Sequence, residues 1–463
     1  MSLRQTGIIS SLHKYQPYQV NYLSTFLFRQ SLPILVALLS LVSHEILAQM
    51  QPGQIKALNK AWNDLGLAGN SHTGLSIYDL QKRKSIFNYR ANNFFTPASN
   101  IKILTMYAAL ELLDEQLDAG YYSVHADSLF IWGGGDPGTF YPDIEAPCAL
   151  AEMIKSSDKK ILFSDQHFRA TRYGEGWAWD DYPYAYQCER NAFPIYGNRL
   201  WINRHNDTIR ITPGYLTPLV KIDVDTITDK GKSEWGDGYF YTYDSRDSMD
   251  EVALPITFFK NDVKYSWTEA TGKEIIMSSA PISDDVLSVK GSQRDTMIRI
   301  MMQESDNFIA EQLLLSCSFR KLHYMMDQDI IDTLLSGPLA DLPDEVDWVD
   351  GSGLSVYNQM TPRSVIAVLL HLLEMKDMAY MKTMFPAAGM TGTLKYGFKL
   401  KNGKPYVFAK SGSLRNTYCL SGFLLTRSGN ILLFSWMNNQ VAVPTADLKS
   451  SMDKFFSFLY DQF

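Results

Sequence analysis

Residues 97–113 read PASNIKILTMYAALELL and form the most strongly apolar helical pattern after the N-terminal region. Pro97 suits a first helical turn, where no backbone N–H is needed, and the apolar residues after it predict a helix over 98–113. Lys102 stands inside this apolar run, three residues after Ser99, so the two side chains share one face of the helix. A desolvated lysine can serve as the base for a neighbouring serine nucleophile. The stretch therefore predicts a buried helix that begins with a Ser-x-x-Lys pair.

The spacing of a serine and a lysine by three positions does not identify a nucleophile by itself. The same spacing recurs at Ser156/Lys159, Ser157/Lys160 and Ser451/Lys454. A lysine in a buried helix is also often a packing residue whose charged end reaches water. The pair Ser99/Lys102 therefore needs support from elsewhere in the chain.

Two later motifs supply that support. Ser305-Asp306-Asn307 places a hydroxyl and a carboxamide on alternate positions, where a helical run resumes. Lys410-Ser411-Gly412-Ser413 ends an apolar strand, and glycine there permits close approach of a ligand backbone. A second Ser-x-Asn, at Ser428 and Asn430, falls in a polar hairpin turn. The order of the three motifs is the one found in penicillin-binding proteins and serine β-lactamases.

Outside the motifs, the pattern of apolar residues changes twice along the chain. Short strand-like pieces with Gly, Pro and Asp turns fill residues 123–284, between two stretches of mixed helix and strand. We expect an α/β (α+β) fold, an antiparallel sheet covered by helices, formed by residues 50–122 and 285–463 and interrupted by a β-rich insertion. Its expected helices cover 54–65, 98–113, 296–316, 364–373 and 446–460, and its expected strands cover 73–79, 85–89, 406–411, 418–426 and 430–437.

Residues 1–49 are expected to be a secretory signal peptide that is removed from the mature protein. An apolar run, Leu32–Val42, follows basic residues and precedes a small residue at Ala48. The run is too short for a bilayer span, which takes about 20 residues, and no cysteine follows it for a lipid anchor. We expect an exported, soluble protein of the periplasm with no stable membrane anchor, and a buried N-terminal helix is the alternative.

Composition excludes several other classes of protein. The chain has 463 residues, of which 46% are hydrophobic and 20% charged, as in folded globular proteins. The formal net charge is −7 and there is no long basic run, which argues against a nucleic-acid partner. The four cysteines form no CxxC, so neither a zinc ribbon nor a redox motif is supported. One or two disulfides and free buried thiols both stay open.

The sequence resembles the DacB-type D-alanyl-D-alanine carboxypeptidase/endopeptidases, the low-molecular-mass class C penicillin-binding proteins. The resemblance covers nearly all the mature chain, and an interval of about 206 positions separates Ser99 from Ser305, where this family inserts extra domains. Ser411 is a departure, because the family more often has threonine there. Further matching segments are Gly134-Gly135-Asp136-Pro137, Gly176-Trp177-Ala178-Trp179-Asp180-Asp181, residues 305–311 (SDNFIAE), residues 350–355 (DGSGLS) and residues 392–394 (GTL).

The resemblance implies a serine-type hydrolase that acts on peptidoglycan stem peptides and is acylated by β-lactams. Ser99 would attack the carbonyl between two D-alanines, with neutral Lys102 as its base. Ser305 would relay a proton to the leaving amine with help from Lys410, and Asn307 would bind the amide backbone of the substrate. No cofactor and no metal are expected.

The same resemblance implies a set of substrate-binding positions on the strand of the third motif. Lys410 and Ser411 would bind the terminal carboxylate, and the glycine of the motif, Gly412, lets the ligand approach. The backbone N–H groups of Ser99 and Ser413 would form the oxyanion hole. The hydroxyl of serine at position 411 can take the place of that of threonine, so activity is not in doubt on that account.

An aromatic-rich stretch, residues 173–201, contains the last candidate residue. Such a run is usually packing between elements, and the alternative is a platform for the peptide stem or glycan. Asp181 lies among these rings and is expected to hold the free amine of the diamino acid in the stem, because local desolvation strengthens the pairing. A solvated acid in a loop is the alternative.

Other enzyme classes fit less well. His371 and Glu374 make an HxxE pair, but no histidine follows as a further zinc ligand and there is no HExxH. A Gly-x-Ser-x-Gly elbow is absent, and residues 133–137 (GGGDP) lack the lysine of a phosphate loop. A serine β-lactamase-like hydrolase, or a non-catalytic envelope-binding protein on the same fold, are the alternatives that stay open.

Overall fold

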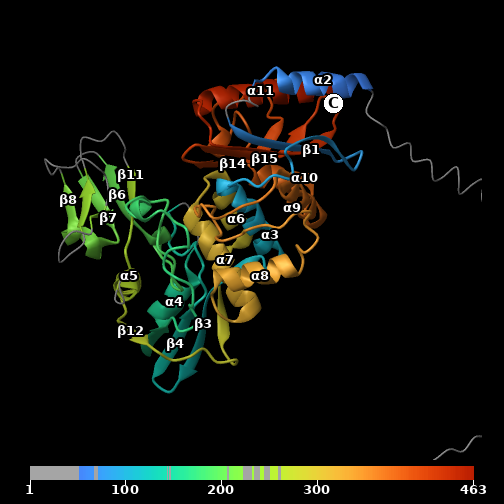
Figure 1. Ribbon diagram of the computed structural model, residues 1–463. Coiled ribbons are helices and arrows are strands. Elements are labelled where there is room, and N and C mark those ends of the chain that lie inside the picture. The colour runs from blue at the N-terminus through green and yellow to red at the C-terminus, as the bar shows by residue number, and fades with distance from the viewer. Residues whose placement is uncertain are drawn as a thin grey trace, which may run out of the picture. The chain divides into compact units, whose positions relative to one another are not determined.

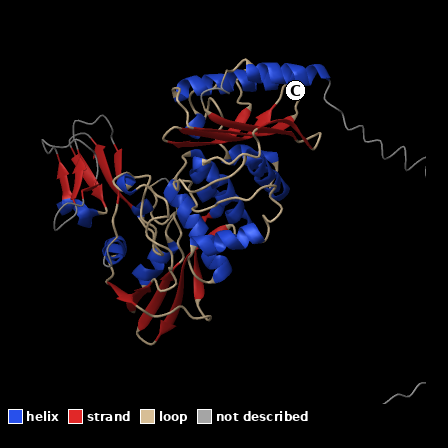
Figure 2. Cartoon of the chain, viewed as in Figure 1, coloured by secondary structure: helices blue, strands red, loops and turns tan. Residues whose placement is uncertain are grey.

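The three strands expected over 406–411, 418–426 and 430–437 lie in a five-stranded antiparallel sheet together with the first two strands of the described residues (Figures 1 and 2). In the computed structural model the strand order is β14 (Val407–Leu414), β15 (Thr417–Leu425), β16 (Ile431–Asn439), β1 (His72–Asp79) and β2 (Lys84–Tyr89). Strand β1 pairs with β16 in a register that places Ser76 opposite Ser435. Segments from the two ends of the described chain thus share one sheet, with β14 at its edge.

The structure describes residues 52–66, 71–142, 144, 147–205, 208–222, 232–233, 240–243, 251–258 and 262–463. The expected signal peptide lies outside the described residues. Within the described ranges, no helix has both the length and the apolar character that a membrane span requires. All four cysteines are described and are free thiols.

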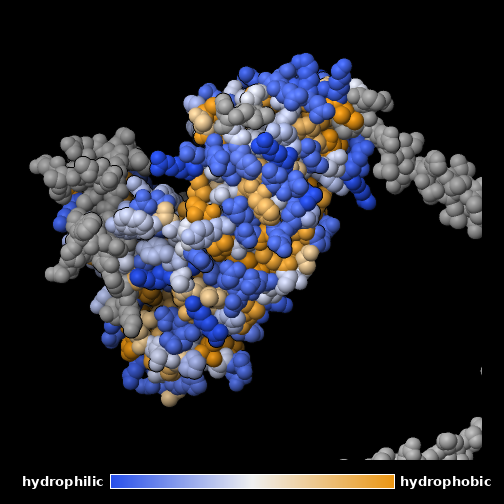
Figure 3. Space-filling model, viewed as in Figure 1, coloured by the Kyte–Doolittle hydropathy of each residue, from blue (hydrophilic) through white to orange (hydrophobic). Residues whose placement is uncertain are grey.

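Helices cover both faces of the five-stranded sheet, as expected for an α/β unit. Helices α2 (Pro52–Asn63) and α11 (Thr445–Gln462) lie together on one face (Figure 1). Trp62 of α2 packs against Trp436 of β16 and Phe455 of α11, so the apolar side of both helices is turned to the sheet. Their outward surface is mainly hydrophilic in the space-filling view (Figure 3).

The other face of the sheet is covered by the helices that carry the first two motifs. The expected helix over 98–113 is a 3-10 turn, η2 (Ala98–Ile101), followed by α3 (Lys102–Leu112). The remaining helices of this layer are α6 (Arg294–Gln303), α7 (Asn307–Leu322), α8 (Asp327–Ser336), α9 (Pro362–Met375) and α10 (Met378–Met384). Their buried side chains form one continuous apolar core with the sheet.

The prediction of one unbroken helix over 296–316 was wrong. The run is divided between α6 and α7, and Ser305 in the break has a left-handed φ of 61°. Asp306 then caps α7, because its side chain accepts a hydrogen bond from the N–H of Ile309 at 2.8 Å. Residues 303–307 (QESDN) are all polar, so the apolar pattern is interrupted at the break, and the expected bounds of the helix ran across this interruption.

A second five-stranded sheet is formed by the middle of the chain. Its order is β12 (Ile275–Ser278), β5 (Lys160–Ser164), β4 (Ser128–Gly133), β3 (Gln116–His125) and β13 (Leu287–Gln293). Helices α4 (Ala149–Ser156) and α5 (Asp262–Thr271) accompany it. Strand β3 runs across the expected boundary at 122/123 and β13 follows the one at 284/285, so the domain limits stay a prediction.

Two three-stranded sheets complete the middle of the chain. One has the order β11 (Glu251–Pro255), β6 (Arg199–His205) and β7 (Thr208–Thr212). The other has the order β8 (Val220–Ile222), β10 (Phe240–Tyr243) and β9 (Lys232–Ser233). A small apolar core that includes Leu200, Leu216 and Tyr241 lies between them. The β-rich character expected of this region is therefore present, together with helices α4 and α5, which the sequence pattern did not indicate.

Candidate active site

Ser99 lies in the 3-10 turn η2, which is held between two glycines from distant parts of the chain. Ala98 has a left-handed φ of 48°, an uncommon conformation for a residue with a side chain. A Cβ on Gly353 would lie 2.0 Å from the carbonyl oxygen of Ala98, and a Cβ on Gly412 would lie 2.5 Å from that of Pro97. Both positions must therefore be glycine for this turn to form. Gly412 thus makes room for the turn that carries Ser99. Its expected role of admitting a ligand backbone stays a prediction.

Lys102 is fully buried at the start of α3 and its ammonium group contacts three oxygens. It donates to Ser99 Oγ at 3.0 Å, to Asn307 Oδ1 at 2.6 Å and to the carbonyl of Ser352 at 2.6 Å. Burial lowers the pKa of Lys102 to about 8, although the carboxylates of Asp350, Asp306 and Glu311 act in the opposite direction. A fraction of the lysine is thus neutral near neutral pH, beside the hydroxyl that it would deprotonate.

A second buried lysine, Lys410 on β14, stands beside the second serine. Its Nζ donates to Ser305 Oγ at 2.8 Å and to the carbonyl of Ser411 at 2.8 Å. Burial, and then the charge of Lys102, lower the pKa of Lys410 well below its usual value. The three motifs therefore meet as two serine–lysine pairs in one polar cluster, in which the lysines are buried and Ser99, Ser305 and Asn307 are partly exposed.

The carboxamide of Asn307 connects the cluster to the aromatic-rich stretch. Its Oδ1 accepts from Lys102, and its Nδ2 donates to the carbonyl of Tyr186 at 2.9 Å. One amide proton of Asn307 is thus already used, which leaves the second for the expected contact with a substrate amide. The orientation of the carboxamide is fixed from both sides.

Strand β14 presents the remaining expected positions at an edge of the sheet. Ser411 Oγ lies 2.7 Å from Thr393 Oγ1, so the hydroxyl is already positioned by a neighbour that the sequence analysis did not single out as a contact. Ser413 is exposed and pairs with Tyr418 of β15. Strand β14 is the last strand of the sheet, and residues 386–388 pair with its first half, Val407–Ala409. An extended peptide can therefore add only along the second half, which carries the third motif.

Asp306, between Ser305 and Asn307, is held by groups from the middle of the chain. Its side chain forms an ion pair with Arg199 at 2.9 Å and accepts from the hydroxyl of Tyr141 at 3.0 Å. The Arg199 guanidinium keeps the pKa of Asp306 below its usual value despite burial. These contacts fix the break between α6 and α7.

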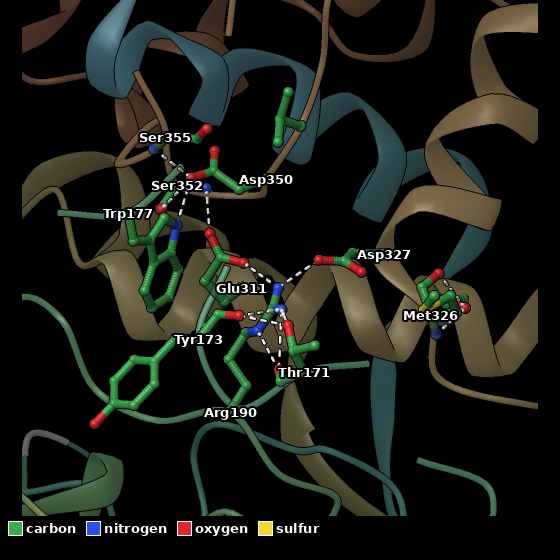
Figure 4. A network of polar contacts seen from close by, with 12 residues as sticks. Thr171, Tyr173, Trp177, Arg190, Glu311, Met326, Asp327, Asp350, Ser352 and Ser355 are labelled. Atoms are coloured by element: carbon green, nitrogen blue, oxygen red, sulfur yellow. Dashed lines mark hydrogen bonds and ion pairs between the residues drawn. The ribbon is translucent and has the colours of Figure 1, made fainter. Parts of the chain in front are cut away.

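Asp350 shapes the loop whose carbonyl contacts Lys102. It accepts from the N–H groups of Gly353 at 2.8 Å and Ser355 at 2.7 Å, and from Trp177 Nε1 at 2.9 Å (Figure 4). The loop, residues 350–355, is thereby curled around one carboxylate. The matching segment DGSGLS is explained in this way, a role that the sequence analysis did not assign.

Asp181 is connected to the polar cluster through one intervening residue, Tyr186. Its Oδ1 accepts from the hydroxyl of Tyr186 at 2.8 Å, and the backbone of Tyr186 contacts Asn307. Tyr186 stacks on Tyr184 with ring centroids 5.4 Å apart, and Trp179 is 81% exposed. Part of the aromatic stretch is therefore solvent-facing and contacts the site, while other members, such as Phe193, are buried.

The competing candidates do not form comparable sites. The hydroxyl of Ser156 donates to the main-chain carbonyl of Met153 at 3.1 Å. The hydroxyl of Ser451 donates to the main-chain carbonyl of Asp447 at 3.0 Å. His371 contacts the carboxylate of Asp341 at 3.0 Å, and no group of three or more metal-ligating side chains occurs among the described residues.

Known proteins resemble both the sequence and the fold. The model of the D-Ala-D-Ala carboxypeptidase 3 (S13) family matches residues 54–234 and 246–460. The D-alanyl-D-alanine carboxypeptidase DacB of Haemophilus influenzae is 23% identical over 430 residues, which is 83% of this chain and 88% of that protein. The D-alanyl-D-alanine carboxypeptidase of Actinomadura sp. is 27% identical over 135 residues, 27% of this chain and 25% of that protein.

The likeness in structure extends over most of the chain. The crystal structure of penicillin binding protein 4 (dacB) from Haemophilus influenzae superposes with a TM-score of 0.68 at 20% identity, and covers 88% of this chain and 99% of that one. A second structure of that protein, complexed with a β-lactam, gives a TM-score of 0.63 at 19% identity over the same shares. The expected fold class, helices and antiparallel sheet in a penicillin-binding protein arrangement, is confirmed.

Proposed function

The chain belongs to the D-Ala-D-Ala carboxypeptidase 3 (S13) family and is a hydrolase of that type, and we propose that it works through an acyl-enzyme on Ser99. The observation that carries the proposal is the position of Lys102 Nζ, fully buried and 3.0 Å from Ser99 Oγ. Lys102 in its neutral form takes the hydroxyl proton while Ser99 Oγ attacks the carbonyl between two D-alanines. The backbone N–H groups of Ser99 and Ser413 receive the negative charge of the tetrahedral intermediate, a contribution typically worth about 3–4 kcal/mol per donor.

Expulsion of the leaving D-alanine needs a proton on its nitrogen. Ser305 gives this proton and regains one from Lys410, to which its hydroxyl is hydrogen-bonded at 2.8 Å. The substrate carboxylate, bound by Lys410 and Ser411, raises the pKa of Lys410 and so restores the charge that burial disfavours. A water molecule then attacks the ester. Its proton replaces the one lost by Lys410, while Lys102 returns its proton to Ser99 Oγ.

The substrate class follows from the family and from the edge strand. We propose that peptidoglycan stem peptides bind in extended form along β14, with Gly412 and Ser413 facing the reacting carbonyl, and that β-lactams acylate Ser99 as substrate mimics. Asp181 holds the free amine of the diamino acid. Export to the periplasm by residues 1–49 would bring the enzyme to this substrate. No residue in the proposed steps requires a metal or a cofactor.

Mass spectrometry of the purified protein after exposure to benzylpenicillin tests the proposal. One adduct is expected, on the peptide that contains Ser99, and none on the Ser99→Ala variant. Ser451→Ala, which removes a serine with the same spacing to a lysine, is the matched control and should label normally. An adduct that persists in Ser99→Ala, or that maps to Ser156 or Ser157, would contradict the assignment. Rapid loss of the adduct would instead indicate β-lactamase-like turnover.

A further inference from the structure

A chain of buried contacts leads from the middle of the sequence to Lys102, and Figure 4 shows its part from Arg190 through Glu311 to Ser352. Arg190 donates to Glu311 Oε2 at 3.0 Å, and Glu311 Oε1 accepts from the N–H of Ser352 at 2.8 Å. The carbonyl of the same residue, Ser352, accepts from Lys102 Nζ at 2.6 Å. The two oxygens of Glu311 thus connect a guanidinium on one side with the loop that contacts the lysine on the other.

The guanidinium of Arg190 is fixed by its own part of the chain. It donates to the carbonyl of Thr171 from two nitrogens, at 3.2 and 3.0 Å, and contacts Asp327 of α8 at 2.5 Å. The Arg190 and Glu311 side chains are each only 1% exposed. Replacing a buried ion pair by apolar residues is often neutral or stabilising, so stability alone is a weak reason for this arrangement.

We propose that Arg190 and Glu311 are positioning residues for Lys102, which act through the carbonyl of Ser352 and keep a negative charge near the ammonium group. The inference rests on the proposed function, because it treats Lys102 as the base. In this arrangement the segment that carries Arg190, which is remote in sequence from Ser99, determines both the position and the protonation state of Lys102.

The charges around the two groups define what each substitution does. Lys102 faces the charge of Lys410 on β14 and three carboxylates. These belong to Asp306, which caps α7, to Glu311 within α7, and to Asp350 in the loop of residues 350–355. Glu311 faces Arg190, Asp327 and Asp350. Burial and Asp350 raise the pKa of Glu311 to about 7, while Arg190 lowers it, so Arg190 favours the charged carboxylate at neutral pH. A charged Glu311 in turn raises the pKa of Lys102.

The test is the pH dependence of benzylpenicillin acylation, followed on the whole protein with variants at the two positions. Glu311→Gln keeps an acceptor for the N–H of Ser352 and removes the charge. The acylation rate rises with pH along an acid limb and then reaches a plateau. In Glu311→Gln we expect this acid limb to move to lower pH by about half a unit, with the rate on the plateau nearly unchanged. Glu311→Ala also removes the acceptor, and should lower the plateau by about tenfold.

The double variant separates positioning from packing. In Arg190→Gln, Glu311 loses its counter-charge and becomes protonated near neutral pH. Adding Glu311→Gln to this variant should therefore not move the acid limb of the acylation rate any further. Arg190→Lys keeps the charge and should restore the limb of the wild type. Arg294→Gln removes another buried guanidinium, which contacts Leu113 and Asp295 away from the cluster, and should lower only thermal stability.

Two outcomes would overturn the inference. One is an unshifted limb in Glu311→Gln together with a loss of thermal stability like that of Arg294→Gln. The other is a shift by Glu311→Gln that is equal in the wild-type and Arg190→Gln backgrounds. Either would leave the role of Ser99 intact, whereas persistent labelling of Ser99→Ala would remove the proposed function itself. The two failures are therefore distinguishable.

Discussion

Arg199, the first residue of β6, forms a buried ion pair of 2.9 Å with Asp306, the residue between Ser305 and Asn307. Both side chains are only 7% exposed. Arg199, from the three-stranded sheet β11-β6-β7, therefore fixes the turn that carries Ser305 and Asn307. Because Ser305 has a left-handed backbone conformation, the turn needs such external support.

Arg199→Gln should lower the free energy of unfolding by about 3–5 kcal/mol, because it leaves the charge of Asp306 buried and unpaired. Denaturant-induced unfolding measures this loss. Arg320→Gln breaks an exposed pair with Asp114 at 3.4 Å and should cost less than about 1 kcal/mol. Equal losses in the two variants would mean that the buried pair contributes no more than a surface pair.

The acylation rate should rise with pH up to about 8 and level off above it. Lys102 must be neutral to accept the proton of Ser99, and burial lowers its pKa to about 8, so the neutral fraction grows tenfold per pH unit below that value. Rates of β-lactam acylation measured from pH 5 to about 10 would show this limb. A rate that is flat across the range would exclude Lys102 as the titrating base.

Ser411→Thr should be nearly neutral, whereas Ser411→Ala should lower turnover efficiency by about tenfold or more. Serine and threonine both offer a hydroxyl to the substrate carboxylate, and a hydrogen bond to a charged group is worth roughly 1.5–3 kcal/mol. Steady-state kinetics on a D-Ala-D-Ala peptide measure the effect. Ser421→Ala removes a buried hydroxyl that bonds Ser435 in the same sheet and should retain activity. Equal activity of all three residues at position 411 would remove it from the site.

Asp181→Asn should lower efficiency on peptides with a free side-chain amine and leave β-lactam acylation unchanged. Asparagine still accepts from the hydroxyl of Tyr186, so the geometry near Asn307 is kept while the charge is lost. Comparison of an amine-bearing peptide with its acetylated form isolates the charge. Asp180→Asn, at the adjacent exposed position, is the control. A parallel loss on peptide and β-lactam would assign Asp181 a structural role.

The motifs could be predicted from the sequence because each is local and each occupies a recognisable element. Ser99, Lys102 and Ser305 lie at element starts or breaks, where side chains meet across short distances. The contacts made by Arg190 and Arg199 could not be predicted, since a buried ion pair between distant segments leaves no periodic signal in either one. The contact of Gly412 with the turn of Ser99 could not be predicted for the same reason, because that turn lies more than 300 positions away along the chain.

The two glycines that hold the turn of Ser99 also determine when activity can first appear. The turn comes from the first quarter of the chain, Gly353 from the last third, and Gly412 from an edge strand near the C-terminus. Contacts of such long range form only after the chain has paid the entropy of closing the loops between them. During synthesis, a chain that has not yet reached β14 lacks Gly412, one of the two glycines that hold the turn of Ser99. It follows that the nucleophile acquires its geometry only after β14 has been synthesised, so a chain that stops short of β14 is an inactive hydrolase.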